Sequence, residues 1–327
     1  MTLKVGLVGT GWFSKMHGEL LAAEEGIEVA AVCGTSKEKA NQLASAFDDA
    51  RGYATITDML DSRRLDAVYI CVPPFAHGEV ELALAERGIP FLVEKPLGLD
   101  MQTPLAVLQA VRSKQLITSV GYHFRYMDSV ARAKQLLENR VVGMALGHWM
   151  GGMPEVSWWR KQEGSGGQIV EQTTHIFDLL RHLLGEVTEV YAAYAQRVIH
   201  TKHEQVSVPD VGTVTLKLQS GAVANISNAC MLSGGGHTGL TVYTDECNLE
   251  LTHGGLVETQ GEHRREYANV SNPYVNELRA FFHAVRTQDA SAILSTYEDA
   301  CRTQQVTVAA NESAQSGLPV RLEPLSL

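Results

Sequence analysis

A glycine-rich turn near the start of the chain constrains the fold more than any other feature. The apolar segment from Leu3 to Val8 runs into Gly-Thr-Gly-Trp-Phe-Ser at residues 9–14, and apolar side chains then recur at helical spacing. A strand, a Gly-x-Gly-x-x-small turn and a helix in this order are the context of a dinucleotide-binding turn. Gly9 would permit the tight turn, and Gly11 would let a pyrophosphate approach the backbone. Ser14 stands where a third glycine or alanine is usual.

The turn opens a series of alternating strands and helices. Buried strands are expected at 29–33, 67–72, 91–93 and 117–122, and the segments between the last three have helical patterns near 78–87 and 101–114. Alternating units of this size predict a mainly parallel, doubly wound sheet with helices on both faces. We therefore expect an α/β dinucleotide-binding Rossmann domain over residues 1–122.

The pattern changes after Tyr122. A helix at 128–139 and a strand at 145–150 precede strand-like segments at 187–197, 210–218, 222–229, 240–244 and 248–251, which turn residues separate. Hairpin signals at 219–221 and 254–255 predict a large, mainly antiparallel, open-faced sheet. Helices at 273–287 and 295–316 and a short strand near 319–322 complete a second α+β domain, 123–327. We expect this domain to bind substrate and to oligomerise, with its final helix able to pack back on the first domain.

The end of the second strand bears on the choice of cofactor. An NAD-preferring site usually carries an acidic residue here to bind the ribose 2′-hydroxyl, and this chain has none. Thr35, Ser36 and Lys37 instead offer donors and a positive charge, which suit the 2′-phosphate of NADP. The same Thr-Ser pair is also an ordinary N-cap for the following helix. We expect NADP to be preferred over NAD.

Glu94-Lys95-Pro96 follows the short apolar strand Phe91–Val93. Ligands of open parallel sheets bind at the carboxyl ends of strands, and a half-buried lysine there can serve as an acid or base. The alternative is an ordinary surface Glu-Lys pair at a strand end. His77, which follows the strand ending near Val72-Pro73, is equally compatible with a ligand contact and with a solvated helix cap.

A single helix from Gln168 to Leu184 is expected after a glycine-rich segment. Its polar residues Glu171, His175, Asp178 and His182 are spaced by four, three and four, which places them on one stripe. Histidines and carboxylates can hold a metal, but the chain lacks His-Glu-x-x-His and a second ligand-rich helix, so we expect no metal. The alternative to a functional stripe is a solvated face with a Glu171–His175 pair.

Together these motifs resemble the glucose–fructose oxidoreductase and inositol dehydrogenase family, Gfo/Idh/MocA. The Gly-x-Gly turn, Glu-Lys-Pro at 94–96 and acid-x-x-x-His-x-x-Asp at 171–178 occur in the family's order, and the resemblance covers essentially the whole chain. It implies that Lys95 transfers the proton and that His175 faces the substrate hydroxyl. Glu171 falls where inositol dehydrogenases of the family have aspartate, and the resemblance implies a role for it in orienting the base. It also implies a mainly structural role for Asp178.

The expected reaction is hydride transfer between nicotinamide and a secondary hydroxyl or carbonyl of a sugar, sugar derivative or cyclitol. The expected substrate contacts are drawn from an aromatic and basic pool: Tyr122, Arg125, Trp159, Arg160 and His175. The expected cofactor contacts come from the strand ends of the first domain: Gly9, Gly11, Trp12, Phe13, Thr35, Ser36, Lys37, Val72, Pro73, His77, Glu94 and Lys95. A non-catalytic dinucleotide-binding sensor of the same fold is the alternative, and retention of Lys95 and His175 argues against it.

Composition excludes several other classes. A net charge of −10 argues against nucleic acid or an anionic membrane as partner, and no apolar run approaches the roughly 18 residues of a membrane span. Five scattered cysteines without a Cys-x-x-Cys pair argue against disulfide scaffolds and thiolate zinc sites. We expect a cytoplasmic protein that forms a homodimer or homotetramer through the open face of its C-terminal sheet.

Overall fold

A computed structural model describes residues 2–325, which form two compact units that are not consecutive along the chain. The first comprises the residues up to Gly98, Gln102–Gly121 and Tyr274–Asp299. The second comprises Leu99–Met101, Tyr122–Pro273 and the residues from Ala300 onward. The change of unit between Gly121 and Tyr122 lies beside the boundary expected from the sequence. The segment Tyr274–Asp299, however, belongs with the first unit.

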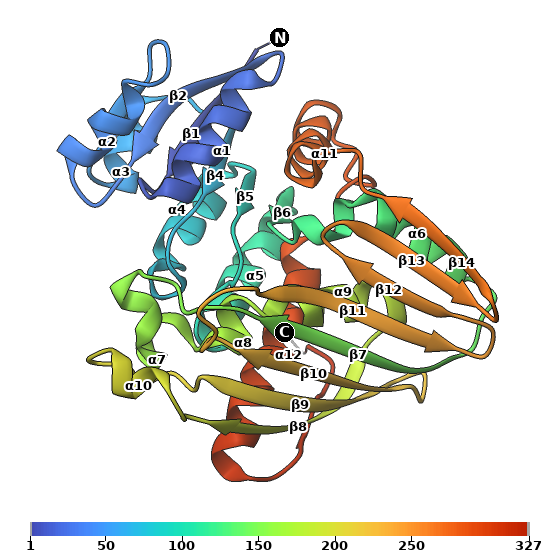
Figure 1. The fold of residues 1–327 in the computed structure, drawn as a ribbon. Coiled ribbons are helices and arrows are strands. Elements are labelled where there is room, and N and C mark those ends of the chain that lie inside the picture. The colour runs from blue at the N-terminus through green and yellow to red at the C-terminus, as the bar shows by residue number, and fades with distance from the viewer. Residues whose placement is uncertain (1, 326–327) are drawn as a thin grey trace. The chain divides into compact units, whose positions relative to one another are not determined.

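A parallel sheet forms the centre of the first unit (Figure 1). Within residues 2–325 this sheet has six strands in the order β3-β2-β1-β4-β5-β6. Their bounds are β1 Leu3–Val8, β2 Ile27–Cys33, β3 Arg51–Tyr53, β4 Ala67–Ile70, β5 Phe91–Val93 and β6 Thr118–Val120. The strand order changes direction between β1 and β4, so the carboxyl ends of these two strands form the edge where an open α/β sheet binds its ligands.

Helices bury this sheet, which explains why its strands are almost continuously apolar. They are α1 Trp12–Ala23, α2 Lys37–Ala44, α3 Ile56–Ser62, α4 Glu79–Arg87, α5 Gln102–Lys114 and α11 Pro273–Thr287, with a short 3-10 helix η1 at Pro74–Ala76. Helix α11 comes from far along the chain, yet Leu278, Phe281 and Phe282 pack in the same core as Val5 and Leu7 of β1. Its apolar face therefore completes the first unit.

The second unit is built on a mainly antiparallel sheet. Among the described residues it has nine strands in the order β14-β13-β12-β11-β7-β10-β9-β8-β15, of which β7 and β10 run parallel. Their bounds are β7 Val142–Met150, β8 Val187–Ala195, β9 Val211–Leu218, β10 Val223–Ala229, β11 His237–Thr244, β12 Asn248–Thr252, β13 Gly255–Gln260, β14 His263–Ala268 and β15 Val320–Arg321. The α/β fold class and the large antiparallel sheet expected from the sequence are confirmed.

Helices pack on one face of this sheet. They include α6 Asp128–Leu137, α9 Thr174–Leu184 and α12 Tyr297–Ser316, and the shorter helical segments are η2 His123–Tyr126, η3 Ser157–Arg160, α7 Gln162–Ser165, α8 Gln168–Glu171 and α10 Ile199–Lys202. Ile176 and Phe177 of α9 share the core with Ala145 of β7 and Ile226 of β10. The alternating burial along β10 shows that the other face is open. On that face Met144 and Val223, which are 38% and 46% exposed, lie opposite each other on neighbouring strands.

Candidate active site

The glycine turn between β1 and α1 has the shape that a dinucleotide requires. Gly9 has φ +117°, and a Cβ there would lie 2.1 Å from the carbonyl oxygen of Cys71, so only glycine fits. Ser14 at the third position is buried, and its hydroxyl donates to the same carbonyl at 3.3 Å. A Cβ on Gly11 would meet open space, and no side chain caps the first turn of α1. Free N–H groups at a helix N-terminus bind phosphate, so the turn fits a pyrophosphate.

The expected 2′-phosphate contacts are the residues that follow β2, Thr35, Ser36 and Lys37. The Ser36 hydroxyl accepts a hydrogen bond from the Lys39 N–H at 3.3 Å and caps α2, which confirms the capping role that the sequence also suggested. Thr35 and Lys37 are exposed, and so is Lys39, a second cation in the same turn that the sequence reasoning did not single out. Glu38 lies between the two lysines. The pKa of Glu38 is lowered by its own backbone N–H and by the Ser36 hydroxyl.

His77 at the end of η1 is not a solvated cap, because its side chain is only 1% exposed. Its Nδ1 lies 2.6 Å from the Glu81 carboxylate, which also accepts the Gly78 N–H at 2.7 Å. Burial acts to raise the pKa of Glu81, but His77 and the backbone N–H groups outweigh burial and hold that pKa below its ordinary value. Nε2 of His77 is buried without a hydrogen-bond partner among the described residues. In this structure His77 is therefore a buried partner of Glu81.

Glu94-Lys95-Pro96 is not a surface pair. Glu94 is 3% exposed, and its carboxylate accepts a hydrogen bond from the Tyr69 hydroxyl at 2.6 Å. Lys95 is half-buried at the carboxyl end of β5, and the Lys95–Pro96 peptide bond is cis. Because β4 and β5 are neighbours in the parallel sheet, Lys95 and the Val72-Pro73 segment follow adjacent strand ends. The first unit thus brings the dinucleotide turn and the lysine to one edge of one sheet.

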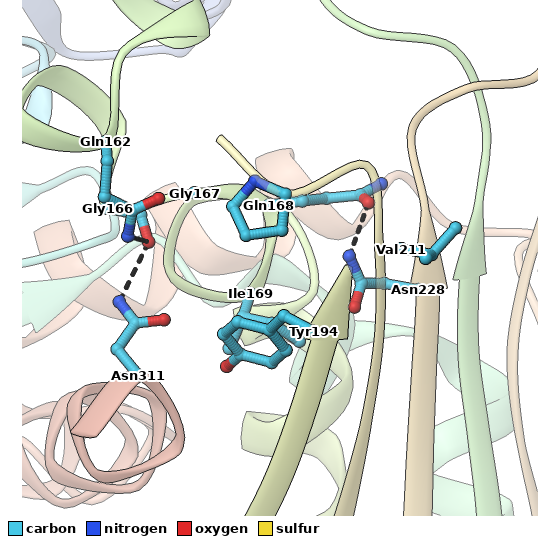
Figure 2. A pocket seen from close by; sticks show the side chains of 10 residues that line it. Gln162, Gly166, Gly167, Gln168, Ile169, Tyr194, Val211, Asn228 and Asn311 are labelled. Carbon is cyan, nitrogen blue, oxygen red and sulfur yellow. Dashed lines mark hydrogen bonds between the residues drawn. The ribbon is translucent and has the colours of Figure 1, made fainter. Parts of the chain in front are cut away.

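In the second unit, the prediction of a single helix from Gln168 to Leu184 is wrong. It is broken into α8 and α9, and the Thr173 N–H bonds to the Gln168 carbonyl five residues back, at 2.8 Å. The turn before α8 is fixed by tertiary contacts: Asn311 donates to the Gly166 carbonyl at 2.9 Å, and Asn228 donates to the Gln168 side chain at 2.6 Å. Figure 2 shows both contacts around the small pocket beside α8. They hold the turn before α8 and the first residue of that helix.

His175, on the first turn of α9, is 5% exposed, so the polar stripe is not a solvated face. Its imidazole stacks on Phe124 at 4.8 Å and on Trp149 at 5.8 Å between ring centroids. Tyr122 and His123 meet it edge-on at 5.8 and 5.0 Å. These rings fix the plane of the imidazole. The sequence reasoning missed Phe124 and Trp149, although the aromatic pattern of residues 122–126 was a visible signal.

Glu171 is oriented by a tryptophan. The indole N–H of Trp159 donates to its carboxylate at 2.7 Å. Trp159 itself is 1% exposed and packs with Ile199, Val208 and Cys230. Its ring is therefore part of a hydrophobic core in this structure. Arg160, the next residue, is half-buried, and its Nε is buried without a hydrogen-bond partner in the part of the chain that the structure describes.

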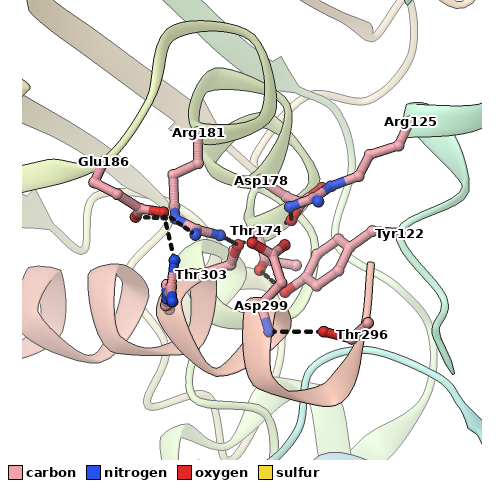
Figure 3. A network of polar contacts seen from close by, with 10 residues as sticks. Tyr122, Arg125, Thr174, Asp178, Arg181, Glu186, Thr296, Asp299 and Thr303 are labelled. Carbon is pink, nitrogen blue, oxygen red and sulfur yellow. Dashed lines mark hydrogen bonds and ion pairs between the residues drawn. The ribbon is translucent and has the colours of Figure 1, made fainter. Parts of the chain in front are cut away.

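Arg125 belongs to a buried ion-pair network (Figure 3). Its guanidinium binds the Asp178 carboxylate through two hydrogen bonds of 2.6 and 2.7 Å. Thr303 of α12 donates to the same carboxylate at 2.9 Å and accepts from Arg181 at 2.7 Å. The hydroxyl of Tyr122, which is fully buried, lies 2.9 Å from that of Thr174. These contacts tie α9 to η2 and α12, so they hold the helix that carries His175.

Comparison with known proteins identifies the family. The model of the oxidoreductase family with an NAD-binding Rossmann fold matches residues 3–122, and that of the GFO/IDH/MocA C-terminal domain matches residues 130–250. The chain belongs to the Gfo/Idh/MocA oxidoreductase family. The resemblance expected from the sequence motifs is confirmed, and so are an NAD-binding fold and a dehydrogenase family.

Similar proteins cover this Gfo/Idh/MocA chain almost completely. Myo-inositol 2-dehydrogenase of Thermotoga maritima is 22% identical over 98% of this chain and 99% of its own length. The NAD⁺-dependent scyllo-inositol 2-dehydrogenase of Bacillus subtilis is 24% identical over 98% of this chain and 96% of its own. A levoglucosan dehydrogenase structure with NADH and L-sorbose has a TM-score of 0.87 at 20% identity and covers 99% of this chain and 100% of its own. At this identity the structural likeness shows the fold.

The described residues contain neither a cluster of metal-binding side chains nor a helix that could span a membrane. Across residues 2–325, no group of three or more His, Cys, Asp or Glu side chains is arranged to hold a metal ion. In the same range, no helix combines the length and the apolar character needed to cross a bilayer.

Proposed function

We propose that the chain is an NAD(P)-dependent dehydrogenase that transfers a hydride between nicotinamide and a secondary hydroxyl or carbonyl carbon of a sugar, sugar derivative or cyclitol. One observation carries the proposal: the first unit places a turn shaped for a pyrophosphate and a half-buried lysine at the same edge of one parallel sheet. Family membership supports it, as do the inositol and levoglucosan dehydrogenases among the similar proteins.

The bound dinucleotide supplies the hydride chemistry, and the protein's own residues handle the hydroxyl proton. The Lys95 ammonium is proposed to donate a hydrogen bond to the substrate oxygen and to stabilise the negative charge that develops on it. His175 is proposed to accept the proton of that hydroxyl, because a neutral imidazole is a general base near neutral pH. The rings around His175 support this role by fixing the imidazole plane.

Glu171 is proposed to orient His175 rather than to react. Its carboxylate is already held by the Trp159 N–H, and a glutamate reaches one methylene further than the aspartate of inositol dehydrogenases. We propose that Tyr122, Arg125 and Trp159 act on the substrate indirectly, because their polar groups already bond to Thr174, Asp178 and Glu171. Arg160 is half-buried, so part of its side chain is accessible, and we propose it as a direct contact.

We propose that the protein binds NADP in preference to NAD. Lys37 and Lys39 are exposed at the end of β2 and would attract the 2′-phosphate, while Glu38 between them opposes it. The remaining expected contacts, from Trp12, Phe13, Val72, Pro73 and His77, follow the carboxyl ends of β1 and β4 and would hold either dinucleotide.

Assembly is proposed to bury the open face of the nine-stranded sheet against a second copy, in a homodimer or homotetramer. Leu146 of β7, 38% exposed, lies beside the Asn225 position of β10, and Tyr191 of β8 is 45% exposed on the same sheet. Met144, Leu146 and Val223 are neighbours on β7 and β10, and adjoining exposed apolar side chains on a regular sheet suit a self-complementary contact. We also propose a cytoplasmic location, which the free state of all five cysteines supports.

A substrate panel tests the proposed function. The purified protein is incubated with NAD or NADP and a set of sugars, sugar derivatives and cyclitols, and reduced nicotinamide is followed by absorbance. Reduction with at least one polyol, lost in Lys95→Ala, supports the dehydrogenase. Tight dinucleotide binding without turnover of any panel member would favour the alternative, a non-catalytic sensor.

A further inference from the structure

We propose that Tyr69 and His17 are positioning residues that hold Glu94, and through it Lys95, against the dinucleotide turn. This inference rests on the proposed function, because there Lys95 stabilises the negative charge that develops on the substrate oxygen. It adds two side chains that no motif in the sequence singles out, one on β4 and one on α1.

The three side chains meet in one buried contact within the first unit. The Tyr69 hydroxyl donates to Glu94 Oε1 at 2.6 Å. His17 Nε2 lies 3.2 Å from the Tyr69 oxygen and 3.5 Å from Glu94 Oε1. Tyr69 and His17 are fully buried, and Glu94 is 3% exposed. The contact therefore joins α1, which begins at the glycine turn, to β4 and to the residue that precedes Lys95.

The geometry fixes the proton on His17. When Glu94 is ionised, the Tyr69 hydroxyl gives its proton to that carboxylate, its oxygen accepts from the imidazole, and Nε2 carries the hydrogen. Nδ1 of His17 is then unprotonated, and it is buried without a partner among residues 2–325. Burial lowers the pKa of His17 to about 3, so the ring is neutral and its 3.5 Å contact with Glu94 is not an ion pair at neutral pH.

Aromatic packing surrounds the His17 ring of this network. The imidazole of His17 stacks on the Tyr69 ring at 4.6 Å, while Phe13 and Tyr274 meet its edges at 4.6 and 5.4 Å. On the other side, a Cβ at Gly121 would lie 2.6 to 2.7 Å from the Glu94 carboxyl atoms. The carboxylate is thus confined between the Gly121 backbone and the Tyr69 hydroxyl, and the Lys95 backbone that follows it inherits this restraint.

The pKa of Glu94 lies near neutral pH. Burial raises its pKa to about 7, and the Tyr69 hydrogen bond and the charge of Lys95 act in the opposite direction. As pH rises through this value, Glu94 becomes negative and gives Lys95 a fixed counter-charge. The other titratable groups that interact with this network come from the end of β4, from η1 and from α11: Cys71, His77, Tyr274 and Glu277.

Tyr69→Phe tests the proposal, because it removes one hydroxyl and keeps the ring. A hydrogen bond to a charged group is lost, so kcat should fall roughly 10- to 100-fold while the affinity for the dinucleotide stays within about twofold. Glu94 loses a donor that favours its ionised form, so the acidic limb of the kcat profile should move to higher pH. Tyr267→Phe is the matched control, because Tyr267 donates a similar bond, 2.9 Å, to Glu258 of the second unit. It should change neither kcat nor the profile.

A second measurement needs no substrate. Reductive methylation with ¹³C-formaldehyde labels the lysines, and Lys95→Arg assigns the Lys95 resonance. In the wild-type protein this resonance should show a second inflection near the titration of Glu94. The inflection should move to higher pH in Tyr69→Phe and disappear in Glu94→Gln. A Lys95 titration that is identical in the wild-type protein and both variants would overturn the proposal, and so would a Tyr69→Phe enzyme that matches Tyr267→Phe. Failure of the substrate panel with these NMR shifts intact would contradict only the dehydrogenase function.

Discussion

Replacing Asp178 by alanine should strongly destabilise the second unit while leaving the first intact. The side chains of Asp178 and Arg125 are 1% and 3% exposed, and two hydrogen bonds of 2.6 and 2.7 Å join them. Removing one partner of such a pair leaves a buried charge uncompensated, which costs about 3–5 kcal/mol. At roughly 2–4 °C per kcal/mol for a unit of this size, the melting temperature should fall by roughly 6–20 °C.

Urea unfolding followed by tryptophan fluorescence is the assay. Three of the four tryptophans, Trp149, Trp158 and Trp159, lie in the second unit, so the signal reports mainly on that unit. Glu189→Ala is the control, because the ion pair of Glu189 with Lys217 is solvated, with the lysine side chain 63% exposed, and exposed pairs contribute little. An Asp178→Ala midpoint equal to that of Glu189→Ala would refute the structural role assigned to this pair. Binding of the dinucleotide, a property of the first unit, should survive in both variants.

Three further predictions concern the turn, the cofactor and the assembly. Gly9→Ala must move the carbonyl of Cys71, because the new Cβ would lie 2.1 Å from its oxygen. Dinucleotide affinity measured by calorimetry should therefore fall about tenfold or more. Affinity equal to that of the wild-type protein would contradict the turn's role, and Gly143→Ala serves as a control. NADP should bind more tightly than NAD, with a preference that weakens in salt and in Lys37→Ala, and calorimetry showing NAD tighter would reverse this assignment. Leu146→Glu should convert a homo-oligomer to monomers in light scattering, and a monomeric wild-type protein would refute the proposed interface.

The sequence was sufficient to predict those elements whose structure is determined by periodicity and local chemistry. Helix α11 was expected at 273–287 and is found at Pro273–Thr287, because its apolar residues recur at helical spacing. Strand β14, in contrast, was not expected. Its residues, His263–Ala268, include two arginines and a glutamate and are almost all exposed, so no apolar alternation marks it. Only pairing with β13 at the edge of the sheet makes it a strand.

Prediction of the candidate site from the sequence meets the same limit. Helical spacing placed His175 and Asp178 on one side of a helix, and both are buried there. Helical spacing alone did not predict the break before Thr174, where the Thr173 N–H bonds to the Gln168 carbonyl. Nor did it predict the contact of the Gln168 side chain with Asn228, sixty residues away in the sequence. The partner of Glu94 could not be foreseen either: Tyr69 is one residue of an apolar strand, and only the parallel register of β4 and β5 brings its hydroxyl to the carboxylate.

The most direct test of the account is the rate of hydride transfer in Lys95→Ala and His175→Ala, measured with a polyol that the wild-type protein oxidises. Each change should lower kcat by roughly 10²–10⁴-fold with dinucleotide affinity retained, and the double variant should lose much less than the sum of the two losses, because the residues act as one unit. Glu171→Gln should have the smallest effect. Turnover by Lys95→Ala at a rate close to that of the wild-type protein would contradict the catalytic role assigned to Lys95.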